Sequence, residues 1–224
     1  FTNASIDVII FRYEKTLKKD TILFNDNLMK CHNNNGILTF LGMEDKTKYI
    51  KLNEICDIYG GLVSGLDKVF KNEKYGNIHI KTDIDKSCKF IFLNELPNVE
   101  NDVTIYLESN KEILSNRRIC KITENNWYKF GAIRNKKIME SENKKCIYMK
   151  TITRNNIISC VDKLQYFSGS LLTIVPKKNE DVLQKLCNFL NSDIFKERYM
   201  SDNRFIISHN QLSNALIPSN LISS

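Results

Sequence analysis

The sequence predicts a mixed α/β protein of the α+β class, with several short, mostly antiparallel strands and a few helices. Two observations lead to this fold class. Short apolar and β-branched runs recur between turn signals, and one long amphipathic pattern lies near the C-terminal end. With 224 residues, 42% hydrophobic and 26% charged, the chain can form one or two domains with a real core.

The first half of the chain predicts strands and turns. Residues 6–13 are apolar and β-branched, which indicates a buried strand. The Asn-Asn-Asn-Gly turn signal at 33–36 predicts a hairpin between residues 21–24 and 36–41. One helical turn is expected at 52–56, followed by a glycine-containing loop at 57–71. Further short strands are expected near residues 77–81, 88–93, 145–150, 156–162 and 171–175.

Two helices are predicted. The clearer one covers residues 180–200, because apolar side chains recur there at helical spacing and Asn179 is a suitable N-cap. A shorter helix is expected at 109–116, with Ser109 as its N-cap.

Charge and cysteine usage narrow the class of protein. The net charge of +7 favours a polyanionic partner. Seven cysteines, at 31, 56, 88, 120, 146, 160 and 187, form no CxxC pair, so we expect buried thiols in a reducing cytoplasm. No apolar run approaches the ~20 residues of a membrane span, so no membrane partner is predicted.

The chain lacks the sequence signals of several catalytic sites. It has no GxGxxG, no P-loop, and no Pro-Pro pair for an Asn/Asp-Pro-Pro-aromatic motif. The three histidines, at 32, 79 and 209, lack metal-ligand spacing. We therefore predict no catalytic residue, metal or cofactor in this chain.

Four segments combine cations with aromatic, amide or glycine residues, the mixture that suits contact with phosphates and base edges. Any one of them could also be a solvated surface or a plain turn. They are the glycine-containing stretch 60–71, the segment 116–137 with the only tryptophan, the polar stretch 150–156, and residues 163–170.

Taken in order, these segments resemble the TaqI-like C-terminal specificity domain of site-specific adenine-N6 DNA methyltransferases from restriction–modification systems. Residues 1–15 (FTNASIDVIIFRYEK) resemble the last strand of the preceding Rossmann-like catalytic domain. The other matching pieces are GLVSGLDKVF at 61–70, NRR at 116–118, WYKFGAIRNKKI at 127–138, IYMKTITRNN at 147–156, QYFSGSLLTIVP at 165–176 and LCNFLNSDIFKERYMSDNRFIISHNQLSNALIP at 186–218.

The resemblance implies three parts: residues 1–15 from a catalytic domain otherwise missing here, a connecting hairpin or linker at 16–50, and a DNA target-recognition domain at 51–224. The parent enzyme would bind S-adenosylmethionine and flip and methylate the adenine. This fragment would be inactive alone. Its partners would be double-stranded DNA and the missing catalytic domain, in the bacterial cytoplasm.

The resemblance also suggests roles for individual residues of the recognition domain. Base edges would be read by Arg134, Asn135, Arg154 and Asn155. Phosphates would be contacted by Lys68, Lys71, Arg117, Arg118 and Lys136, and loops would be supported by Trp127, Phe130 and Tyr166.

Two alternatives remain open at this stage. A recognition domain from the specificity subunit of a multisubunit restriction enzyme has a similar strand–helix–Ile-Pro ending, but would normally occur twice and be joined by long helices. A basic protein-interaction module would carry its positive charge incidentally, and its binding would not follow the salt dependence of duplex contact.

Overall fold

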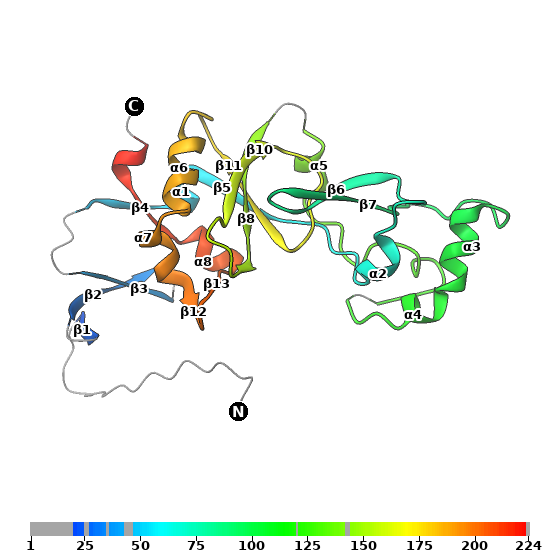
Figure 1. Ribbon diagram of the computed structural model, residues 1–224, viewed down its shortest axis with the longest axis horizontal. Coiled ribbons are helices and arrows are strands. Elements are labelled where there is room, and N and C mark those ends of the chain that lie inside the picture. Colours follow the sequence, from blue (N-terminus) through cyan, green and yellow to red (C-terminus); the bar gives the residue numbers. More distant parts are fainter. Residues whose placement is uncertain are drawn as a thin grey trace. The chain divides into compact units, whose positions relative to one another are not determined.

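A computed structural model describes residues 20–24, 27–34, 36–42, 47–119, 121–141 and 144–222. Many short antiparallel strands form small sheets, accompanied by several helices, which confirms the predicted α+β class (Figure 1). The strand predicted at 6–13 lies outside the described residues. All six cysteines of the described chain are free thiols.

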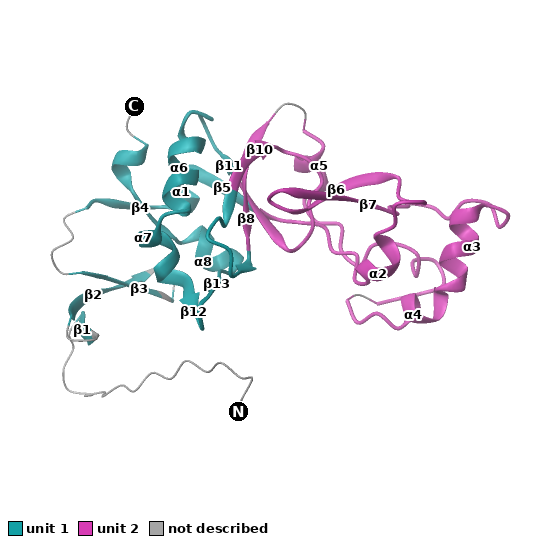
Figure 2. Ribbon diagram, viewed as in Figure 1, with its two compact units in different colours: residues 1–58, 151–159, 175–224 teal, residues 59–150, 160–174 magenta. Residues whose placement is uncertain are grey.

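The chain divides into two compact units (Figure 2). Unit 1 combines Phe1–Ile58, Thr151–Ser159 and Val175–Ser224, and unit 2 combines Tyr59–Lys150 and Cys160–Ile174. This division differs from the predicted boundary at residue 50. The reason is a pairing between distant segments of unit 1, in which Ile217 lies opposite Ile50 in an antiparallel ladder.

The hairpin at the start of unit 1 differs from the predicted one. The strands β1 (Thr21–Phe24), β2 (Asn27–Asn34) and β3 (Ile37–Gly42) form a sheet in that order. The partner of β3 is therefore β2, and β1 pairs only with β2. The turn at Gly36, whose φ is 82°, joins Asn34 to Ile37 directly, so its two strands must be immediate neighbours. Polar residues along β2 concealed this strand in the sequence.

The rest of unit 1 consists of short elements. Leu52–Ile55 forms the helical turn α1, as predicted. The other elements are β4 (Tyr49–Lys51), β9 (Ile152–Thr153), α6 (Val182–Leu190), α7 (Asp193–Lys196), η1 (Glu197–Tyr199), β12 (Met200–Ser201), β13 (Arg204–Ile206), α8 (His209–Ser213), β14 (Leu216–Pro218) and η2 (Ser219–Leu221).

The single helix predicted at 180–200 is wrong, because α6 ends at Leu190 and α7 begins at Asp193. The Asn191 side chain accepts hydrogen bonds from the backbone N–H groups of Ile158 (2.8 Å) and Ser159 (3.1 Å). Ser192 then adopts an extended backbone and caps α7. The predicted N-cap, Asn179, lies before α6 and accepts a hydrogen bond from the N–H of Asp181, which holds the N-cap position instead.

Unit 2 is built around one sheet and one hairpin. The sheet has the order β10–β8–β11–β5, and β6 pairs with β7. Five of these strands lie where short strands were expected. The elements that lie wholly or partly in unit 2 are β5 (Cys56–Gly60), α2 (Asp67–Phe70), β6 (Ile78–Asp83), β7 (Lys86–Phe90), α3 (Asp102–Ser109), α4 (Lys111–Ser115), α5 (Lys136–Met139), β8 (Lys145–Lys150), β10 (Ser159–Lys163) and β11 (Leu171–Pro176).

The helix expected at 109–116 is also corrected. Ser109 is the last residue of α3, and Asn110 precedes α4 as its N-cap residue. The Ser109 hydroxyl donates to the Tyr106 carbonyl at 2.7 Å, and α4 begins without a side-chain cap hydrogen bond. A preceding helix beginning at Asp102, capped by the Asn101 side chain, was missed because its apolar pattern is weak.

Two ion pairs connect the β6–β7 hairpin to the sheet of unit 2. Lys81 contacts Asp162 at 2.6 Å, and Lys150 contacts Asp83 at 2.7 Å. Both lysine side chains are buried, whereas the aspartates are partly exposed. These cations therefore serve the packing of unit 2 and are not available at its surface.

Candidate functional site

The glycine loop, residues 60–65, lies between two of the four segments singled out in the sequence. Val63 and Ala132 exchange backbone hydrogen bonds of 3.0 and 2.9 Å. On the other side, Leu62 donates to the Phe167 carbonyl (2.8 Å) and accepts from Gly169 (2.7 Å). Backbone pairing in unit 2 thus brings together segments 60–71, 116–137 and 163–170.

Two glycines of the loop are required by the backbone, Gly61 by a close approach and Gly65 by its left-handed conformation. A Cβ on Gly61 would lie 2.2 Å from the carbonyl oxygen of Ser168, a distance that no side chain tolerates. Gly65 has a φ of +81°, in the left-handed region where glycine is favoured. The loop can therefore pass directly against the 167–169 segment.

Arg117 holds the glycine loop from inside unit 2. Its side chain is buried, with 7% exposure, and its guanidinium donates to the carbonyls of Leu114, Ser64, Lys129 and Trp127 at 2.6–2.9 Å. It also lies over the Phe70 ring, 5.1 Å from the centroid. These contacts correct the prediction that Arg117 contacts phosphate, because its donors are already used by backbone carbonyls.

The aromatic residues of the 116–137 segment lie in the core of unit 2. Trp127 and Phe130 are buried, at 3% and 7% exposure. Phe130 meets Phe70, Phe90 and Phe92 edge-on, with centroids 5.1–6.1 Å apart. This burial leaves neither ring available for stacking on a ligand.

Tyr166 is only partly buried and donates its hydroxyl to Glu140 at 2.6 Å. Desolvation, followed by the hydrogen bond to the Glu140 carboxylate, raises the pKa of the Tyr166 hydroxyl to about 12. The phenol therefore stays protonated and connects the 163–170 segment to the turn after α5.

Four predicted phosphate or base contacts are exposed on unit 2: Lys68, Lys71, Arg118 and Arg134. Lys68 lies in α2 and Lys71 directly follows it, on either side of the buried Phe70. Burial of Phe70 fixes the backbone positions from which these two lysine side chains extend. Within the described part of the chain, none of the four side chains has a hydrogen bond or ion pair. Their charges are therefore free to meet an anionic partner.

Two neighbouring candidates have partners of their own. Asn135 adopts a left-handed backbone with φ of 54°, and its side chain donates to the Gly60 carbonyl at 2.9 Å. Lys136 pairs with Glu140 at 3.6 Å and lies over the Phe92 ring. Both residues order the segment around Arg134, and base or phosphate contact would require them to exchange these interactions.

Arg154 and Asn155 lie in unit 1, in the turn after β9, and both are exposed. The backbone N–H of Asn155 donates to the Thr153 hydroxyl at 3.0 Å, which shapes this turn. Their side chains remain candidates for base reading within unit 1.

The structure reveals a hollow of about 300 Å³ beside the glycine loop that sequence reasoning missed. Its polar lining includes Ser64, Asp67, Lys71, Ser168 and Ser170. Lys71 alone had been singled out. The hydroxyls come from three segments of the chain, at Ser64, at Thr82, and at Ser168 and Ser170. The backbone pairings of Leu62 and Lys81 with the 166–169 segment bring them together.

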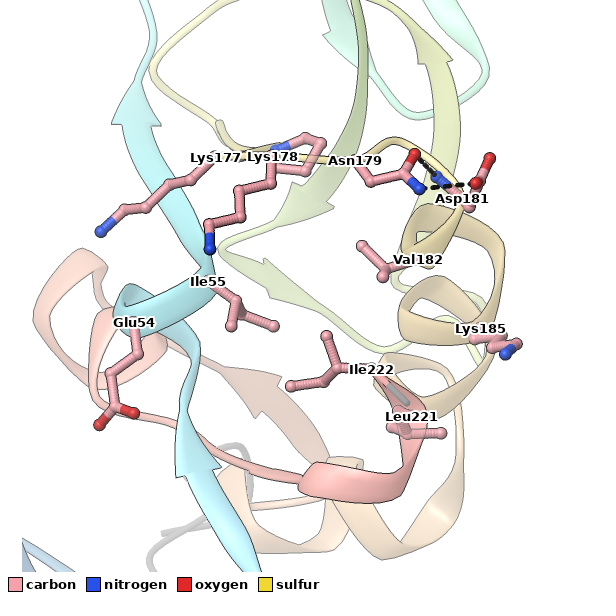
Figure 3. Close-up of a pocket in the computed structure, with 11 residues that line it drawn as sticks. Glu54, Ile55, Lys177, Lys178, Asn179, Asp181, Val182, Lys185, Leu221 and Ile222 are labelled. Carbon is pink, nitrogen blue, oxygen red and sulfur yellow. Dashed lines mark hydrogen bonds between the residues drawn. The ribbon is translucent and has the colours of Figure 1, made fainter. Parts of the chain in front are cut away.

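Unit 1 contains a second hollow, of about 410 Å³, with a different character (Figure 3). Ile55, Val182 and Ile222 point toward one another across it, while Lys185 points away. Lys177, on its rim, donates to the Asn53 carbonyl at 2.6 Å and lies 3.8 Å from Asp57. An apolar interior with a polar rim suits an apolar group better than a phosphate.

Comparison with known proteins adds no family assignment. No protein-family model matches the sequence, and no curated protein matches it significantly. Across the described residues, no helix is long and apolar enough to cross a membrane. The same residues contain no group of three or more His, Cys, Asp or Glu side chains arranged to hold a metal ion.

Proposed function

We propose that this chain is a DNA target-recognition module that binds double-stranded DNA. The observation that carries the proposal is the set of unpartnered, exposed cations Lys68, Lys71, Arg118 and Arg134 on the ordered frame of unit 2. Lysine and arginine at a surface supply the phosphate contacts that dominate affinity for DNA, and arginine also suits the guanine edge. The net charge of +7 has the sign that this partner requires.

More particularly, we propose the specificity domain of an S-adenosylmethionine-dependent adenine-N6 DNA methyltransferase of a restriction–modification system, acting in the bacterial cytoplasm. The ordered sequence resemblance supports this assignment. The cofactor and the flipped adenine would belong to a catalytic domain that works beside this chain. Arg134, Arg154 and Asn155 would read bases, with Lys68, Lys71 and Arg118 on phosphates.

The main rival is a protein-interaction module, for which the same cations would meet acidic side chains. The two functions differ in sequence preference, since only a recognition domain selects one duplex over another. A recognition domain from a multisubunit restriction enzyme would also select duplexes, and would differ in working beside a separate methylation subunit.

Selection from a random duplex library tests the proposal. The purified chain should enrich a defined site at low salt, with affinity approaching the non-specific range of roughly 10⁻⁴–10⁻⁶ M, because under this proposal the chain would bind without the contacts of its catalytic partner domain. Arg134→Ala should change which site is enriched, because Arg134 is proposed to read a base. Arg118→Ala is the matched control and should weaken binding to all duplexes alike, because Arg118 is proposed to contact phosphate. Lack of any enriched sequence, together with binding that is insensitive to salt, would favour the protein-interaction module.

Methyl transfer by the chain alone provides a separate check. With labelled S-adenosylmethionine and the selected duplex, we expect no transfer of label to DNA. Site-specific labelling by the isolated chain would overturn the assignment of the chemistry to another domain.

A further inference from the structure

The hollow beside the glycine loop has the wrong chemistry for a phosphate. A phosphate site needs hydrogen-bond donors and positive charge. Here Lys71 is the one cation in the lining and Asp67 the one carboxylate, so their charges offset each other. The hollow therefore calls for a ligand group other than an anion.

The serine hydroxyl hydrogens around the hollow already donate to other groups of the chain. Ser64 donates its hydroxyl to the Asp67 carboxylate. Ser170 donates to the Thr82 carbonyl at 2.9 Å, and so Ser168 must be the donor in the 2.5 Å contact between the Ser168 and Ser170 hydroxyls. A serine hydroxyl has one hydrogen and two lone pairs. Among the described residues, the Ser168 hydroxyl donates to Ser170 and accepts no hydrogen bond, so it still offers acceptor capacity to a ligand.

The Asp67 carboxylate is both exposed and firmly oriented. Its Oδ1 accepts from Ser64, a residue with only 3% exposure. Ser64 is itself held at its carbonyl by the Arg117 guanidinium (2.6 Å) and by the N–H of Gly131 (3.2 Å). Within the described chain, the second carboxylate oxygen of Asp67 accepts no hydrogen bond and forms no ion pair. A fixed acceptor next to the Ser168 lone pairs suits a ligand that donates hydrogen bonds.

We propose that Asp67 reads an exocyclic amino group on a base edge, the N4 amino group of cytosine or the N6 amino group of adenine. This inference rests on the proposed function, since it names the base chemistry recognised beside the glycine loop. In the major groove these amino groups are the hydrogen-bond donors, and carboxylates accept from them. Ser64 is the positioning residue that fixes the Asp67 carboxylate. The positive charge of Lys71 offsets the repulsion between this carboxylate and nearby phosphates.

The test is duplex selection with the Asp67→Asn variant of the whole chain, compared with Asp85→Asn. Asp85 is exposed, does not line the hollow and undergoes the same change of charge. We expect Asp67→Asn to lose roughly 5- to 150-fold of discrimination at one base pair, while Asp85→Asn keeps the wild-type preference. Ser64→Ala should relax the same position by a smaller factor.

Base analogues distinguish the two possible amino groups. At the position that Asp67→Asn relaxes, replacing adenine by purine, or cytosine by 2-pyrimidinone, removes the amino group alone. Wild-type binding should fall with one of these replacements, and Asp67→Asn should be insensitive to it.

Two further outcomes would overturn the inference in different ways. If Asp67→Asn and Asp85→Asn strengthen binding to every duplex by the same factor, Asp67 merely repels phosphates and the proposed DNA recognition stands. If the wild-type chain selects no duplex sequence at all, the proposed function fails, and the reading role of Asp67 fails with it.

Discussion

Two basic segments of unit 2 carry similar residues and use them in opposite ways. The Arg117 guanidinium is buried and donates to four backbone carbonyls, so it stabilises the fold and is not available to a ligand. The segment around Arg134 is exposed and is held by the Asn135 hydrogen bond and the Lys136 ion pair. The Arg134 side chain itself has no partner among the described residues. The adjacent Arg118 is exposed as well.

The difference teaches that local structure decides whether a cation is structural or available. Turns leave carbonyls without helix or strand partners, and such groups must be paired when they are buried. The turn residues near Arg117 supply several carbonyls at one place, and a guanidinium has five N–H donors. In the Arg134 segment, Ala132 instead pairs with the Val63 backbone, and the Arg134 side chain has no backbone carbonyl as partner among the described residues.

The largest expected effect comes from removing the buried guanidinium. Arg117→Met keeps much of the apolar stem but leaves the carbonyls of Leu114, Lys129 and Trp127 without a donor, while the Ser64 carbonyl keeps only the Gly131 N–H. We therefore expect a loss of about 3 kcal/mol or more in the free energy of unfolding. Urea denaturation measures it, with Arg118→Met as the control, expected within about 0.5 kcal/mol of wild type. Equal stability of the two variants would contradict the structural role.

The glycine loop provides the next test. Gly61→Ala would place a Cβ 2.2 Å from the Ser168 carbonyl oxygen, whereas Gly60→Ala meets nothing within 4 Å. We expect Gly61→Ala to destabilise the protein by roughly 1–3 kcal/mol and Gly60→Ala to have little effect, because only the first forces backbones apart. Thermal unfolding of the pair decides this. A harmless Gly61→Ala would mean that the loop is not pressed against the 167–169 segment.

On the exposed side, Arg134→Ala should alter recognition and leave stability nearly unchanged. Losing a bidentate contact to a guanine edge would cost about 1–3 kcal/mol at one base pair. Lys71→Ala, as a phosphate contact, should weaken binding to all sequences alike and flatten the salt slope by about one unit. Binding to the selected duplex and its single-base variants separates them. A uniform loss for Arg134→Ala would reassign it to the phosphates.

A smaller effect concerns Lys81, a second buried cation. Partial burial would raise the pKa of Asp162, but the hydrogen bonds from Lys81 and from the Lys163 N–H outweigh it and hold the pKa below its usual value. The pairing thus stabilises the fold above the unfolded-state pKa of about 3.9, and this contribution is lost as pH falls through the lower folded-state pKa. Unfolding measured against pH should show it, and Asp162→Asn should lack this part of the dependence.

Sequence reasoning predicted the fold class and five of the six strands that lie wholly or partly in unit 2, most clearly β8 and β11, which are nearly continuous apolar runs. It missed β5, most of which lies in the segment expected to be a loop. It misjudged the 180–200 helix, whose break depends on the Asn191 side chain reaching residues 158 and 159. It also counted Arg117 as a surface cation. No local pattern distinguishes Arg117 from Arg118, since the difference arises from the carbonyls of Ser64 and Trp127, which lie elsewhere in the chain.

The hollow beside the glycine loop was missed for the same reason. Asp67 and Ser168 lie near opposite ends of the sequence of unit 2, so no motif with a fixed residue spacing could have connected them. The four cation-bearing segments were recognised because charge and aromatic content are local properties. Which of their side chains remain exposed is set by tertiary pairing, and only the folded chain reveals it.

The most direct test of the account is the salt dependence of duplex binding for wild type and for a variant with Lys68, Lys71, Arg118 and Arg134 all changed to Gln. Each phosphate contact adds about −0.9 to the slope of log K against log salt, so losing the three phosphate contacts of Lys68, Lys71 and Arg118 should flatten the slope by roughly three units. Its unfolding free energy should stay close to that of wild type. An unchanged slope in a folded variant would contradict the claim that these exposed cations bind DNA.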